Sequence, residues 1–178
     1  MVNPIQAVTL EEVLAARDRR AEKQRRIIRE YSTPLLSFMV NTPGAYKDTL
    51  LSRLVFEEGI AAILRELHQN SLKPIYREIN YCPTGAEAYL AVNSDELDLK
   101  RITVQIENHH PLGRLFDIDL IKSDLNPASR IEIGESPRKC LLCNENAFAC
   151  ARSQRHSLTE LTKKIESLIS GYFFQTGE

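Results

Sequence analysis

The sequence lacks any apolar run long enough to cross a membrane. Its longest apolar stretches, residues 34–40 and 59–64, fall far below the roughly 18 consecutive apolar residues that a spanning helix needs. The start of the chain also lacks the apolar core and small-residue cleavage site of a secretory signal, because it runs directly into Glu11 and Glu12. We therefore expect a cytoplasmic protein with no membrane partner.

Cysteine and net charge are also scarce. The four cysteines are more often thiols or metal ligands than disulfides in a reducing compartment. The formal net charge is −1 at pH 7, which makes nucleic acid the least favoured partner. The charge is uneven, because residues 17–29 and 138–164 are basic and the acids gather between them. This distribution suits a phosphorylated ligand held with a cation, although solvated helix faces produce charge runs more often.

The composition is that of one globular domain spanning residues 1–178. A chain of 178 residues that is 43% hydrophobic and 26% charged fits a domain of ordinary size. Hydrophobic periodicity, turn residues and capping signals divide it into elements. They predict an N-terminal helix over about 9–31, a strand over 35–41, a helix over 48–70, strands over 75–81 and 87–92, a helix over 94–108, and a strand over 115–121.

The segment 94–108 is ambiguous. Ile102, Val104 and Ile106 alternate as in a strand, whereas Leu99, Ile102 and Ile106 behind an acidic first turn suit a helix, and we choose the helix. The core, about residues 35–121, is then α+β with the order β-α-β-β-α-β. This is the ferredoxin-like arrangement, in which two helices cover one face of an antiparallel sheet. A short strand near 131–133 should follow, and then a cysteine-rich turn and a C-terminal helix over about 137–172.

The first helix carries polar residues on its apolar face. Arg17, Arg20 and Gln24 are spaced i, i+3 and i+7, in line with the apolar residues before and after them. Polar groups on an inward face must find partners. They either line an anion pocket or extend their stems past the core into water, and the sequence favours neither.

Two aspartates form the strongest local signal. In a strand over 115–121, Asp117 and Asp119 point to one face, while Phe116 and Ile118 point to the other. If that face is partly enclosed, the repulsion between the carboxylates must be relieved by protonation or by a cation. Carboxylate pairs of this kind suit Mg²⁺, which also binds substrate phosphates. An alternating strand with one wet face is nevertheless the commoner origin of such a pattern.

A second cluster has metal-ligand spacing. Cys140 and Cys143 form a Cys-x2-Cys pair, and Cys150 and His156 follow closely enough to complete a Cys3His tetrahedron. Zinc sites usually place the two pairs further apart, so small thiols that pack a loop are the alternative. A structural zinc is possible here.

Two turns carry weaker signals. Residues 42–47 join a strand to a helix and end in Lys47, which with the helix N-terminus could bind phosphate, but the glycine count of a P-loop is missing. His109 and His110 precede Pro111 and could supply a base near the aspartates. Turn histidines without any role are as common.

Several ordered motifs resemble one family, the holo-citrate lyase synthases or apo-citrate lyase phosphoribosyl-dephospho-CoA transferases. The resemblance covers most of the chain. The matching residues are His110-Pro111-Leu112-Gly113-Arg114-Leu115 with Asp117 and Asp119, then Pro137-Arg138, Cys140, Cys143, Cys150-Ala151-Arg152-Ser153 and His156-Ser157, together with Arg17, Arg20, Gln24, Pro43-Gly44, Lys47, Thr84-Gly85 and Glu87.

The resemblance implies an enzyme. Members of that family move a phosphoribosyl-dephospho-CoA unit from triphosphoribosyl-dephospho-CoA to a serine of the acyl carrier (gamma) subunit of citrate lyase, with release of diphosphate. It implies Mg²⁺ at Asp117 and Asp119, with His110 as a candidate base and Glu87 as a candidate third acid. The candidate substrate-binding residues are Arg17, Arg20, Gln24, Lys47, Gly113, Arg114, Arg138 and Arg152. The alternative from a different class is a zinc-stabilised protein-interaction module without catalysis.

Overall fold

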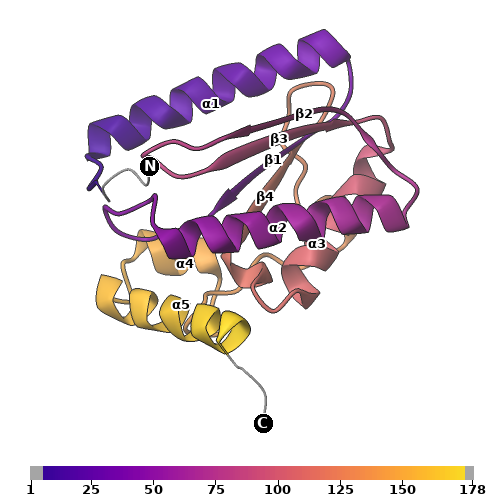
Figure 1. Cartoon of the computed structure of the whole chain (residues 1–178). Helices are drawn as coiled ribbons and strands as arrows, with labels where there is room; N and C mark the ends of the chain where they lie inside the picture. The colour runs from indigo at the N-terminus through magenta and orange to yellow at the C-terminus, as the bar shows by residue number, and fades with distance from the viewer. Residues whose placement is uncertain (1–5, 175–178) are drawn as a thin grey trace.

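Residues 6–174 are described by the computed structural model, and they form an α+β fold with a four-stranded sheet and five α-helices (Figure 1). The elements are α1 (Leu10–Tyr31), β1 (Leu35–Val40), α2 (Leu50–Gln69), β2 (Pro74–Asn80), β3 (Glu87–Val92), α3 (Glu96–His109), β4 (Phe116–Ile121), α4 (Ala147–Arg152) and α5 (Leu158–Phe173), with short 3₁₀ turns η1 (Gly113–Leu115) and η2 (Ile131–Ile133).

The sheet has the strand order β2-β3-β1-β4, and every neighbouring pair is antiparallel. β1 and β3 are the interior strands, and β2 and β4 form the two edges. Between β1 and β4 the elements follow the predicted order, strand, helix, two strands, helix and strand.

The main core lies between the sheet and the layer of α2 and α3. Leu36 and Phe38 of β1 and Phe116, Ile118 and Leu120 of β4 all point into it and are almost fully buried. Apolar residues of α5 pack against the same cluster, and Figure 1 shows α4 and α5 at the end of the domain beside the start of α2. Every second residue of β4 is thereby committed to the core.

The other face of the sheet is covered by α1 (Figure 1). Ile27 and Ile28 of this helix form a second buried cluster with Leu35, Tyr89 and Ala91 from β1 and β3. Because α1 packs mainly on β1 and β3, the edge strand β4 lies beside this helix rather than under it. The sheet is thus sealed by apolar contacts at one end of α1 and free to carry polar groups at the other.

Local signals account for the helix boundaries. α1 begins with the predicted capping box, in which Thr9 and Glu12 each accept a backbone N–H of the other. The same motif starts α5 at Ser157 and Glu160. α1 ends before Pro34, whose ring cannot continue a helix.

The structure confirms one predicted element and contradicts another. The helix predicted for 94–108 is confirmed as α3, whose cap Asp95 accepts two backbone N–H groups. The strand predicted near 131–133 is wrong, because these residues form the 3₁₀ turn η2 and Ile131 is 71% exposed. The alternation of Ile131 and Ile133 covers only three residues, which is too short a pattern to distinguish a strand from a turn.

Candidate active site and candidate metal centre

Asp117 and Asp119 lie on the face of the sheet that α1 covers in part. In the antiparallel register, Asp117 is opposite Met39 and Asp119 is opposite Ser37. Met39 is in turn opposite Glu87 on the far side of β1. Directly opposite residues in an antiparallel sheet share a face. The two aspartates therefore belong to a polar surface that continues across β1 to β3.

Polar residues of α1 reach down to this surface and are paired there. Arg20 donates from Nε and Nη2 to Oε1 of Glu87, at 3.1 and 2.9 Å. The hydroxyl of Tyr89 donates to the other Glu87 oxygen at 2.6 Å, and Gln24 donates to the hydroxyl of Ser37 at 2.9 Å. Of the two alternatives that the sequence left open, extension past the core into water does not describe Arg20 and Gln24, because both side chains are paired with groups on the sheet.

The environment raises the pKa of both aspartates. Burial raises the pKa of Asp117, and the charges of Arg138 and Arg20 oppose this. Asp119 keeps contact with solvent, yet the crowding of protein atoms around it, followed by the charge of Asp117, raises its pKa to about 6. The two carboxylates therefore repel each other in a setting that solvent only partly relieves.

A second polar cluster flanks the outer edge of β4. Glu107 of α3 is buried and accepts the backbone N–H of Ile118 on that edge at 3.3 Å. It also pairs with Arg130 at 2.6 Å and with Arg138. Lys100, two turns before Glu107 on the same side of α3, is buried too, and its charge acts on Asp119. Glu107 thus fixes the position of Arg138 next to the aspartates.

Sequence reasoning missed Lys100 and Glu107. A signal was present, because Lys100, Thr103 and Glu107 have the same i, i+3, i+7 spacing that drew attention to the polar face of the first helix. All three are buried.

The remaining basic candidates are spread over several elements. Lys47 is half-buried in the loop between β1 and α2 and donates to the carbonyl of Thr42, and burial lowers its pKa. Arg114 of η1 donates to the carbonyl of Lys139. Arg17 on α1 and Arg152 at the end of α4 are exposed, and neither forms an ion pair within residues 6–174.

Gly113 owes its identity to close packing. A Cβ atom there would lie 2.6 Å from the carbonyl oxygens of both Ile106 and Glu107. Only glycine lets η1 approach the end of α3 this closely, and this approach sets the start of β4. Packing therefore requires glycine at position 113, independently of any contact that this residue makes with the substrate.

The structure does not bring His110 to the aspartates. Its ring packs on Phe116, with centroids 5.0 Å apart, and on Tyr172, and its Nε2 lies 3.4 Å from a carboxylate oxygen of Glu58. Phe116 and Asp117 are successive strand residues, so their side chains point to opposite faces of the sheet. The expectation that His110 is a base beside the acid pair is therefore not supported by the geometry.

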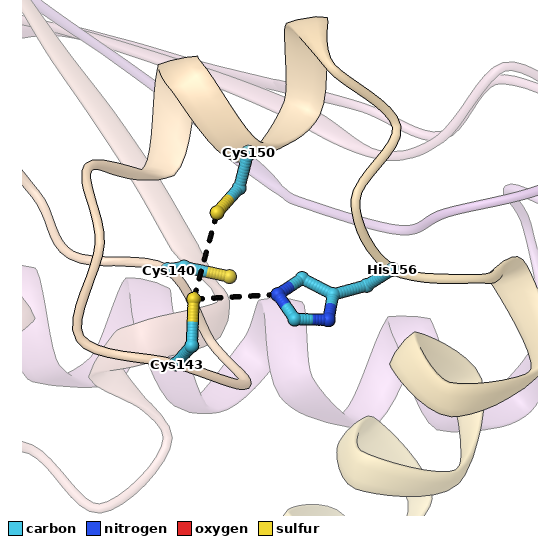
Figure 2. Close-up of side chains that lie close together, drawn as sticks. All are labelled: Cys140, Cys143, Cys150 and His156. Carbon is cyan, nitrogen blue, oxygen red and sulfur yellow. Dashed lines mark hydrogen bonds between the residues drawn. The ribbon is translucent and has the colours of Figure 1, made fainter.

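The four predicted metal ligands converge, as Figure 2 shows. Their ligand atoms all lie within 4.8 Å of one another. The sulfur of Cys143 is 3.5 Å from that of Cys150 and 3.3 Å from Nε2 of His156. Tetrahedral zinc with ordinary bond lengths places two sulfurs about 3.8 Å apart and a sulfur and a nitrogen about 3.5 Å apart. Cys140, Cys143, Cys150 and His156 could therefore bind a metal ion such as zinc.

Backbone groups around this cluster favour the thiolate form at one ligand. Burial raises the pKa of Cys140, but hydrogen bonds to its sulfur from the N–H groups of Leu142 and Cys143 and from the thiols of Cys143 and Cys150 together outweigh it, so the pKa is lowered. Thiolate is the form that binds metal. The candidate metal centre aside, none of the helices in residues 6–174 combines the length and the apolar character that a membrane span requires.

Comparison with known proteins places this geometry in a family. The family profile described as apo-citrate lyase phosphoribosyl-dephospho-CoA transferase matches residues 8–172. A protein of that name from Citrobacter koseri is 36% identical over 163 residues, covering 92% of this chain and 89% of the relative. One from Escherichia coli O7:K1 is 34% identical over 164 residues, covering 92% and 90%. The chain therefore belongs to the apo-citrate lyase phosphoribosyl-dephospho-CoA transferase family.

Proposed function

We propose that this protein performs the reaction for which its family is named, the transfer of a phosphoribosyl-dephospho-CoA unit to apo-citrate lyase. The donor is triphosphoribosyl-dephospho-CoA, and the acceptor is a serine of the acyl carrier (gamma) subunit. The serine oxygen forms a bond to the phosphorus nearest the ribose as the serine hydroxyl loses its proton. The bond from that phosphorus to the outer two phosphates breaks, and diphosphate leaves.

The observation that carries this proposal is the acid pair on β4. Asp117 and Asp119 share one face, burial raises the pKa of both, and the charge of Asp117 raises the pKa of Asp119 further, so a cation that binds both would relieve an existing strain. Their oxygens are the ligands that Mg²⁺ takes when it also binds phosphates. We propose that these two residues would hold Mg²⁺, which would neutralise charge on the triphosphate.

Two arginines are positioned to share this task. Arg20 is fixed by Glu87 and Arg138 by Glu107, and both lower the pKa of Asp117 through their charge. A cation that is held in advance does not have to be ordered during the reaction, which makes it more effective on the developing charge. Glu87 uses both oxygens on Arg20 and Tyr89, so we assign it to positioning Arg20 rather than to the metal.

The other predicted substrate residues differ in their support. Gln24 belongs to the polar face beneath α1. Arg114 and Lys47 lie at the end of the sheet where β1 finishes and β4 starts. Arg17 and Arg152 are exposed, and we propose that they meet phosphates or the carrier subunit at the periphery.

We further propose that the cysteine cluster holds a structural zinc ion. All four positions of a tetrahedron would be filled by Cys140, Cys143, Cys150 and His156, and a site without an open position has a structural role. Such a site would tie the long segment after β4 to α4 and to the start of α5. The alternative of a zinc-stabilised module then becomes part of the enzyme rather than a competitor to it.

The arrangement of the sheet supports a ferredoxin-like assignment for the core. Interior strands β1 and β3, edge strands β2 and β4, and two helices on one face are the features that this assignment requires. In it, α1 would be the addition that turns the second face of the sheet into a polar site.

Mass spectrometry of the carrier subunit tests the proposed function. The protein is incubated with triphosphoribosyl-dephospho-CoA, Mg²⁺ and apo carrier, and the carrier should gain the mass of the phosphoribosyl-dephospho-CoA unit. Asp117→Asn should abolish the gain, whereas Asp18→Asn on the exposed face of α1 should leave it intact. Bound zinc without any mass gain would favour the interaction module instead.

A further inference from the structure

A cavity of about 580 Å³ opens between the cysteine loop, α5 and the end of the sheet. Arg114, Arg138 and Lys139 contribute to its wall beside Cys140, Cys150 and His156 of the candidate metal centre, and no carboxylate does so among the residues that the structure describes. Arg114 and Lys139 form no ion pair within residues 6–174. Partial burial lowers the pKa of Arg114. The cavity is thus a basic site with two cations that no acid of the described chain neutralises.

A second cavity of about 610 Å³ adjoins the first. Pro43, Leu115, Leu158 and Ile165 belong to the walls of both, so the two spaces share one partition. The second wall is mainly apolar, and Glu166 is its only charged residue in the described part of the chain. Leu158 stands at the partition with 53% of its surface exposed, so its side chain is open to a ligand that enters either cavity.

Arg138 and Leu115 connect the basic cavity to the acid pair. Arg138 lies in its wall and also pairs with Glu107 and acts on both aspartates. Leu115, the last residue of η1, lies in the same wall, two residues before Asp117 of β4. A ligand bound across Arg138 would therefore have one end at the aspartates and the other in the two cavities.

We propose that the two cavities bind the dephospho-CoA half of the donor, with its internal diphosphate in the basic cavity and its pantetheine arm in the apolar one. This inference rests on the proposed function, because the acid pair takes only the triphosphate end of the same molecule. Along the donor, the triphosphate is followed by two riboses with the adenine base, then by the diphosphate and last by a long arm with few charges. The acid pair, the basic cavity and the apolar cavity follow one another in the same order as the triphosphate, the diphosphate and the arm. Each cavity also has the size of an ordinary small-molecule site.

Isothermal titration calorimetry with dephospho-CoA, without added divalent cation, tests the inference separately from catalysis. Wild-type protein should bind this fragment. Lys139→Ala removes one cation from the basic cavity and should weaken binding about fivefold. Leu158→Ser removes apolar surface at the partition and should weaken it about tenfold.

Matched controls come from the same chain. Leu50 is also the first residue of a helix, is 69% exposed and lies outside both cavities, so Leu50→Ser should change affinity less than twofold. Lys163→Ala on the exposed face of α5 serves the same purpose for Lys139. Zinc content and thermal unfolding are measured for every variant, so that a disturbed cysteine loop is not mistaken for a lost contact.

The outcomes separate this inference from the proposed function. Asp117→Asn should bind dephospho-CoA as the wild type does, because the fragment has no triphosphate. If the fragment does not bind, or if Lys139→Ala and Leu158→Ser bind it normally, the cavities have another occupant and the inference is overturned even when transfer is active. Loss of carrier binding in these two variants would identify that occupant as the acceptor and would equally overturn it. Fragment binding that follows the predicted order, in a protein without transfer activity, would uphold the site and reject the reaction.

Discussion

Replacing Asp119 by asparagine should make the protein inactive and more stable at the same time. In the absence of a divalent cation, the carboxylate of Asp119 is repelled by Asp117 and is partly withdrawn from water. Asparagine has nearly the same shape and no charge, so Asp119→Asn removes the repulsion without opening a cavity. A residue whose role is structural would show the opposite, a loss of stability.

The size of the gain follows from the pKa. A carboxyl group whose pKa rises from 3.8 to about 6 destabilises the folded state by at most about 3 kcal/mol at neutral pH. Asp119 is exposed to solvent, and screening reduces such energies several-fold, which leaves about 1 kcal/mol. For a chain of this length, that corresponds to a rise in Tm of roughly 2–4 °C.

The gain should depend on pH in a defined direction. The folded-state pKa lies above the unfolded-state value, so between about pH 4 and pH 6 the folded wild type binds more protons than the unfolded chain. As the pH rises through this window, the free energy of unfolding of the wild type therefore falls relative to that of the variant. The difference in Tm should be small near pH 3.5, grow through pH 5 and reach its full size above pH 6.

Calorimetry in EDTA-free buffer stripped of divalent ions, followed by addition of Mg²⁺, provides the assay. Mg²⁺ should raise the Tm of the wild type and of Asp18→Asn, but not that of Asp119→Asn. A lower Tm for Asp119→Asn at pH 7.5, or an equal response of both proteins to Mg²⁺, would refute the reasoning that the pair is a strained cation site.

Three further predictions concern other parts of the molecule. If the cysteine cluster holds the proposed zinc, Cys143→Ser should bind less zinc than the wild type and unfold at lower temperature, as metal analysis and calorimetry would reveal, and unchanged stability would count against a structural metal. Lys23 and Tyr76 lower the pKa of Glu78 to about 2. In urea titrations, Glu78→Gln should therefore reduce the free energy of unfolding by about 1–2 kcal/mol at pH 7, and by progressively less as the pH falls from about 4.5 to 2, because the wild type then loses the stabilising charge. A reduction that does not depend on pH would exclude the ion pair as its source. Gly113→Ala should cost about 2–3 kcal/mol in the same titrations because its Cβ would meet two carbonyl oxygens, and a cost below 1 kcal/mol would mean that η1 moves freely.

Strand alternation was sufficient to predict the acid pair. The apolar residues Phe116, Ile118 and Leu120 could only face the core, so the two aspartates had to share the other face, and the structure places them there. The polar stripe of the first helix was predictable for a similar reason, since an inward Arg20 demands a partner. Its partner Glu87 could be suspected from the motif but not located, because the register between β1 and β3 is a tertiary property.

Other parts of the site depend on contacts that are distant in the sequence. His110 is seven residues from Asp117 along the chain, and this proximity suggested a shared site. The close approach of Gly113 to the end of α3 turns the chain between them, so the ring of His110 enters the core side of the sheet instead. The walls of the two cavities combine segments more than a hundred residues apart, and a local sequence pattern cannot predict such a surface.

The same alternation explains how the fold tolerates two strained carboxylates. A slip of β4 by one residue would not separate the two carboxylates, because it would move both together into the apolar layer under α2 and α3, and it would expose three large apolar side chains. Burying each of those side chains is worth about 1.5–3 kcal/mol, which exceeds the roughly 1 kcal/mol that the pair costs. The edge of β4 is also pinned by Glu107, which accepts the backbone N–H of Ile118. The core therefore holds the acids in register, and their unrelieved charge remains available to a cation.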